Sequence, residues 1–178
     1  YTPILFYYDE PSLAGKFGLS LAIANMIGII SSSWLTVSIP KMTKAVAENE
    51  FKMFKILFRE SFFKSLAFLI FSLISVCSLY LFFENNHIIS RLLEFKSFAG
   101  ILAIIFLMHL INSIVIYLRC FKKEPLVNIH FACSIVTLLL GLFMIPLYSV
   151  NGLILIIILI QAFIALPISI NKLRTFQY

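Results

Sequence analysis

Charged residues are scarce in this chain, and their scarcity excludes an ordinary soluble domain. Lys, Arg, Asp and Glu make up 12% of the 178 residues, against 61% for the hydrophobic residues. A soluble domain carries about twice that charged fraction. The net charge of +6 is spread between apolar runs and forms no single basic patch, so we expect no nucleic-acid partner. The composition predicts an all-α, polytopic membrane protein.

Motifs for catalysis and for metal binding are also missing. The three cysteines show no C-x-x-C spacing, which argues against a disulfide framework or a structural zinc site. The sequence contains no G-x-S-x-G, no H-E-x-x-H and no glycine-rich phosphate loop. We therefore expect no catalytic residue, no metal and no cofactor. For a membrane-embedded enzyme, the one weak candidate is the loop 84–96, which contains His87, Arg91 and Glu94.

What the chain does contain is long apolar runs. A helix needs about 20 such residues to cross a hydrocarbon core of about 30 Å. Residues 1–8 are apolar but too few, so we expect them to be the end of a truncated helix and the sequence to be a fragment. The whole of 1–178 is expected to form one transmembrane bundle. Its five full helices are expected at residues 17–39, 62–83, 98–118, 126–148 and 153–173.

The segment after the first expected helix differs from the rest because it is charged. Pro40 is expected to end that helix, since proline has no N–H and its ring clashes with the preceding turn. Residues 41–60 are then expected to form a cytoplasmic connector. Its periodicity predicts an amphipathic helix that lies in the membrane interface and attracts anionic lipid. The apolar face of that helix holds Phe51, Phe54, Leu57 and Phe58, and the basic face holds Lys52, Lys55 and Arg59.

Basic residues lie mainly on one side of the expected membrane. If the connector is cytoplasmic and the helices alternate, 11 of the 14 Lys and Arg residues face the cytoplasm. Only Lys16, Arg91 and Lys96 fall on the other side. Short cytoplasmic loops carry this excess of positive charge in membrane proteins. The carboxy terminus is therefore predicted to be cytoplasmic.

The first expected helix carries small and polar residues on one face. They follow steps of three and four residues, and Ile29 is the single bulky member of the series. Such a face either packs closely against another helix or lines a wet cavity in which it meets substrate. The face alone does not decide between these two interpretations. Its small and polar members are Gly18, Ala22, Asn25, Ser32 and Thr36.

Polar residues inside the membrane are costly, so each is a candidate for function. His109 and Asn112 lie one turn apart and can share a helix face. Hydrogen bonding between helices explains such residues in most cases, while histidine also titrates near neutral pH and could couple transport to protons. The complete set is Asn25, His109, Asn112, Asn128, His130 and Gln161.

The stretch 15–55 resembles a known family. A glycine-led helix ends in a serine- and threonine-rich segment, followed by Ile-Pro-Lys-Met at 39–42 and a basic connector with Phe-Lys-Met-Phe at 51–54. This order is similar to the second half of the Wzx-like polysaccharide flippases, in the multidrug/oligosaccharidyl-lipid/polysaccharide exporter superfamily. A short basic turn before residue 126 and Asn151-Gly152 before the last helix fit the same spacing. The resemblance covers nearly the whole chain.

The resemblance implies the carboxy-terminal lobe of a two-lobe transporter in the bacterial inner membrane. Such a protein flips undecaprenyl-pyrophosphate-linked oligosaccharide by alternating access, for O-antigen, capsule or exopolysaccharide synthesis. Its central cavity would have a cationic, hydrated lining, with Lys16 at the outer mouth and Asn25, Ser32 and Thr36 facing inward. The implied partners are the missing amino-terminal lobe, the lipid-linked substrate, anionic lipids and a polysaccharide polymerase.

Two alternatives stay open. The first is a cation-coupled multidrug antiporter of the same fold, which the lack of an intramembrane carboxylate disfavours. The second is a membrane-embedded polysaccharide polymerase, for which a long arginine-rich outer loop would be expected. The candidate residues of the substrate path are Lys16, Asn25, Ser32, Thr36, His109 and Asn112.

Overall fold

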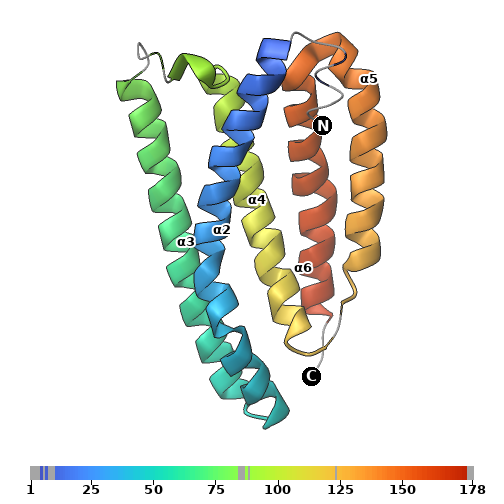
Figure 1. Cartoon of the computed structure of the whole chain (residues 1–178). Helices are drawn as coiled ribbons and strands as arrows, with labels where there is room; N and C mark the ends of the chain where they lie inside the picture. Colours follow the sequence, from blue (N-terminus) through green and yellow to red (C-terminus); the bar gives the residue numbers. More distant parts are fainter. Residues whose placement is uncertain are drawn as a thin grey trace.

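The structure, a computed structural model, consists of helices and connecting turns (Figure 1). It describes residues 5, 7, 11–83, 87, 89–122 and 124–175. The prediction of an all-α protein is confirmed, and four helical segments are long and apolar enough to cross a membrane. The elements are α2 (Pro11–Ala47), α3 (Phe51–Phe82), η1 (Ile89–Arg91), α4 (Phe95–Arg119), α5 (Val127–Ile160), the π-helix η2 (Gln161–Ala165) and α6 (Leu166–Arg174).

Two expected segments fall partly outside the described residues. Of the expected truncated helix at 1–8, only Leu5 and Tyr7 are described; both are helical, and Leu5 is fully buried in the main core. In the loop 84–96, residues 84–86 and 88 lie outside the described part. The three residues that made this loop a weak enzyme candidate are exposed: His87, Arg91 and Glu94.

The prediction that Pro40 ends the first helix is wrong. α2 runs through Pro40 and continues to Ala47. A proline in a membrane helix costs one backbone hydrogen bond, and packing compensates for it here. Met42 and Ala45, beyond the proline, are buried in one cluster with Phe54 of α3. The 37 residues of α2 make a helix about 56 Å long, which bends in its lower part (Figure 1), as helices do at proline.

The expected interfacial connector at 41–60 is also absent as a separate helix. Its first residues belong to α2 and its last ten begin α3, with a tight turn at Asn49, whose φ is 60°. The predicted apolar face exists, but it covers protein and not lipid. Phe54 is fully buried, and the centroid of its ring lies 4.9 Å from those of Tyr117, in the last turn of α4, and Phe121, in the turn that follows α4. Aromatic packing of this kind ties the α2–α3 hairpin to α4.

The last apolar segment, Val127–Arg174, has 48 residues and would measure about 72 Å as one straight helix. It reverses direction at Ser149, where φ is 53° and ψ is −144°, so α5 consists of two helices (Figure 1). The sequence placed this turn at Asn151-Gly152, two residues later. Asn151 is already helical, and its Oδ1 accepts a hydrogen bond of 2.6 Å from the Ser97 hydroxyl of α4.

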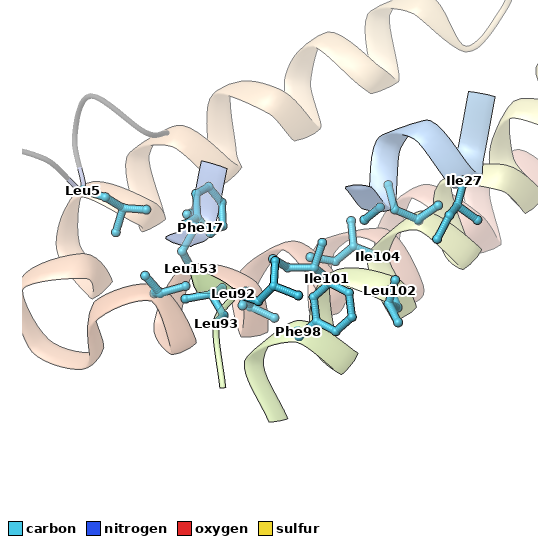
Figure 2. Packing of buried hydrophobic residues seen from close by; sticks show 14 of the residues in the cluster. Leu5, Phe17, Ile27, Leu92, Leu93, Phe98, Ile101, Leu102, Ile104 and Leu153 are labelled. Carbon is cyan, nitrogen blue, oxygen red and sulfur yellow. The ribbon is translucent and has the colours of Figure 1, made fainter. Parts of the chain in front are cut away.

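The main core joins α2, α4 and the second half of α5. Phe98 and Ile101 of α4 belong to one buried cluster with Leu153 of α5 and Phe17 of α2, and all four side chains are at most 3% exposed (Figure 2). α3 packs chiefly against α2, and α6 packs against α4. In Figure 1 the helices therefore stand from left to right in the order α3, α2, α4, α6 and α5.

The closest approach between α4 and α5 requires a glycine. A Cβ atom added at Gly100 would lie 2.6 Å from the Cγ2 atom of Ile154, which is far below van der Waals contact. At Gly18 of α2, by contrast, an added Cβ would meet no atom within 4 Å. Gly18 is therefore a suitable control for a substitution at Gly100, because of the two only Gly100 is crowded.

We expect Gly100→Ala to lower the free energy of unfolding by about 1–3 kcal/mol, because the methyl group forces the two helices apart. Gly18→Ala should leave it unchanged or raise it by up to about 1 kcal/mol, because alanine favours the helix. SDS unfolding of the purified variants in detergent measures both. An equal loss in both variants would contradict the proposed close contact.

Candidate functional site

A cleft of about 990 Å³ opens between α2, α4, both halves of α5 and η2. Ligand sites are usually concave and mainly apolar, with a few polar groups, and their volumes reach about 1,000 Å³. This lining has that character: isoleucine, leucine and valine predominate, and polar side chains interrupt them. The polar and charged members of the lining are Asn25, Ser32, Thr36, His109, Asn112, Arg119, Glu124, His130, Ser134, Thr137 and Gln161.

The polar face of α2 borders this cleft. Asn25 and Thr36 are exposed there, and Ile29, the bulky member of the series, is 73% exposed. A Cβ atom added at Gly18 would meet no atom within 4 Å, whereas Oγ of Ser32 on the same face lies 3.3 Å from Nδ1 of His109 on α4. The described helices therefore cover this face at Ser32 and leave Asn25, Ile29 and Thr36 exposed. Whether substrate meets the face stays a prediction.

Close packing uses a different face of α2. The Ser65 hydroxyl of α3 donates to the backbone carbonyl of Ser31 at 2.5 Å, and the Ser61 hydroxyl donates to Ser38 Oγ at 2.7 Å. Serine is small enough for two helix backbones to approach, and its hydroxyl then bonds across the interface. These serines form the seam between α2 and α3.

His109 of α4 extends this seam to a third helix. Its ring is 3% exposed; Nε2 lies 3.1 Å from Ser65 Oγ and Nδ1 lies 3.3 Å from Ser32 Oγ. Because Ser65 donates its proton to the Ser31 carbonyl, its oxygen accepts from His109, and Nε2 must carry a proton. In the neutral ring, Nδ1 then accepts from the Ser32 hydroxyl. One imidazole thus connects α2, α3 and α4, and Ser32 is the link that also lines the cleft.

The structure brings five of the six candidate residues to the cleft. They come from two helices: Asn25, Ser32 and Thr36 from α2, and His109 and Asn112 from α4. Lys16 is half-buried and does not line the cleft.

Two residues on the opposite wall were missing from that candidate set. His130 of the first half of α5 and Gln161 of η2 both line the cleft. The Nε2 atom of His130 and the Oε1 atom of Gln161 are buried without a hydrogen-bond partner among the described residues. A buried polar atom without a partner costs about 1–3 kcal/mol. In the sequence, His130 and Gln161 can be recognised as polar residues inside apolar runs. Their position across the cleft depends on where the chain reverses at Ser149.

The charge of the lining differs from the cationic cavity that the resemblance implies. Among the described lining residues, the one cation is Arg119 and the one anion is Glu124. They form an ion pair, with 2.9 Å between Arg119 Nε and Glu124 Oε1. The described wall therefore presents no unpaired charge to a ligand.

No protein-family model, no curated protein and no solved structure gives a significant match to this chain.

The two histidines of the cleft should respond differently to the same change. His109→Leu breaks two side-chain hydrogen bonds between helices, and we expect the free energy of unfolding to fall by about 1–2 kcal/mol. His130→Leu removes a side chain whose buried Nε2 atom has no hydrogen-bond partner among the described residues, so stability should be unchanged or higher. Unfolding in SDS measures both variants. A larger loss for His130→Leu would show that His130 is structural.

Proposed function

We propose that this chain is part of a membrane transporter whose substrate path is the cleft. The observation that carries the proposal is the exposed polar face of α2, which borders about 990 Å³ of open space inside a bundle of otherwise apolar helices. Asn25 and Thr36 are left exposed by the residues that the structure describes. A hydrated path for a polar substrate accounts for the exposure.

Within that class, we propose the carboxy-terminal lobe of a Wzx-like flippase for lipid-linked oligosaccharides, working by alternating access. The sequence pattern at 15–55 supports this assignment. On this proposal the chain crosses the bacterial inner membrane five times, because the reversal at Ser149 divides the last of the four apolar segments into two. The exposed side of α2 would face the amino-terminal lobe of such a transporter across the substrate path.

The distribution of basic residues supports an orientation with the carboxy terminus in the cytoplasm. The α2–α3 turn, the α4–α5 turn and the end of α6 lie at one end of the bundle (Figure 1). That end carries most of the described basic residues, among them Lys44, Arg119 and Arg174. Positive charge favours the cytoplasmic side and would attract anionic lipid there. A polysaccharide polymerase would receive the product on the opposite side.

A second candidate is a cation-coupled antiporter of the same fold. The buried imidazole of His109, linked through Ser32 to the cleft, is the observation that favours it. The described part of the cleft offers Glu124 as its one carboxylate, and this is paired with Arg119. The antiporter predicts drug efflux that depends on His109, whereas the flippase predicts surface polymer.

Complementation tests the flippase proposal. The gene, with any sequence that flanks this chain, is restored to a strain that lacks its surface-polysaccharide flippase, and surface polymer and lipid-linked repeat units are measured. We expect polymer to return and intermediates at the cytoplasmic face to fall. Intermediates that reach the outer face without this protein, yet stay unpolymerised, would favour the polymerase alternative.

In the same assay, Asn25→Leu and Asn112→Leu should each lower surface polymer by about 5–10-fold, the effect of one lost hydrogen bond to substrate. Asn128→Leu is the matched control, because Asn128 is exposed but does not line the cleft. Equal activity in all three variants, at equal protein levels, would remove the cleft from the substrate path.

A further inference from the structure

The most informative feature of the cleft is the pair of unsatisfied polar side chains on its α5–η2 wall. Hydroxyl groups elsewhere in the helices have partners: the hydroxyls of Ser31, Ser113, Ser134, Thr137 and Ser169 each donate to the backbone carbonyl four residues earlier. His130 Nε2 and Gln161 Oε1 are the two buried side-chain polar atoms that lack a partner within the described residues.

The backbone at Gln161 is unusual in the same place. η2 is a π-helix over Gln161–Ala165, and its first and last residues both line the cleft. A π-turn accommodates one residue more than an α-turn, is rare, and occurs frequently at functional sites. The irregular backbone and the unpartnered amide therefore coincide on one wall.

The charge of the lining restricts the ligand that this wall can bind. The Arg119–Glu124 pair neutralises itself, and the other described polar groups of the lining are amides, hydroxyls and imidazoles. Such groups both donate and accept hydrogen bonds, which matches the hydroxyls of a sugar. A phosphate or a cation would need an opposite charge that the described lining does not supply.

We propose that His130 and Gln161 form a binding subsite for an uncharged sugar unit, with Asn112 on the facing helix α4. This subsite rests on the proposed function and assigns one part of the substrate to one wall. The oligosaccharide is bound by neutral hydrogen-bonding groups at α5 and η2. The pyrophosphate lies outside this wall.

Histidine nitrogen signals provide a direct test, because the chain has three histidines, His87, His109 and His130. The protein is labelled with ¹⁵N-histidine, placed in lipid nanodiscs and titrated with dodecyl maltoside below its micelle concentration. Dodecyl phosphate is the charged probe with the same tail. We expect the maltoside, but not the phosphate, to shift the Nε2 signal of His130, while the signal of the exposed loop residue His87 stays fixed.

Variants test whether the change in the His130 signal reports binding at the wall formed by α5 and η2. Gln161→Leu should weaken maltoside binding by about 5–10-fold, as for one lost hydrogen bond. Asn128→Leu, an exposed change on the same helix as His130 but outside the cleft, should leave binding unchanged. Both variants should keep the wild-type His109 signal, which reports that the bundle is folded.

Three results would overturn the subsite. They are equal or tighter binding of dodecyl phosphate, maltoside binding that leaves the His130 signal and the Gln161→Leu affinity unchanged, and no maltoside binding at all. The assay measures binding without transport. If the protein fails complementation but binds maltoside at His130, the subsite stands and the flippase proposal is wrong. If it complements but does not bind maltoside, the flippase proposal stands and the subsite is wrong.

Discussion

The hydrogen bond from the Ser65 hydroxyl to the Ser31 carbonyl, with His109 bonded to the same oxygen, is the interaction on which the arrangement of α2, α3 and α4 depends. In a bilayer, lipid is as apolar as the side chains, so helices associate through close packing and hydrogen bonds and not through a hydrophobic drive. The serine seam supplies both for α2 and α3. His109 joins α4 to these two helices. At the basic end of the bundle, Phe54 of α3 makes a second junction with α4 through Tyr117 and Phe121.

This use of α2 determines where the cleft lies. One face of the helix is occupied by α3 and α4, through Ala24, Ser31 and Leu35, all buried. The face with Asn25 and Thr36 is left with no described partner and borders the cleft. Ser32 is the exception on this face, because it bonds to His109 of α4 and also lines the open space. Structural and candidate functional roles thus meet in a single turn of helix.

The sequence predicts most of the helices and the polar face of α2, and the features that it does not predict have physical causes. Apolar run length predicts the helices, and three- and four-residue spacing places Asn25, Ser32 and Thr36 on one face. Pro40 does not end α2, because the packing of Met42 compensates for the lost backbone hydrogen bond. The sequence shows the proline but not that packing. Asn151-Gly152 indicates the reversal at Ser149 to within two residues, whereas the π-turn at Gln161 has no composition signal. His130 and Gln161 could therefore be noted as polar, but not placed on one wall.

The first half of α5 has an attachment that differs from that of the other helices. Its apolar surface is largely exposed, with Phe143 at 73% and Leu147 at 71%. The turns at its two ends contain Lys122, with φ of 57°, and Ser149, with φ of 53°, in a backbone region that such residues rarely adopt. Both turns thus fix the course of the backbone where the first half of α5 begins and where it ends. Because His130 and Thr137 lie on this helix, the position of one wall of the cleft depends on the backbone of these two turns.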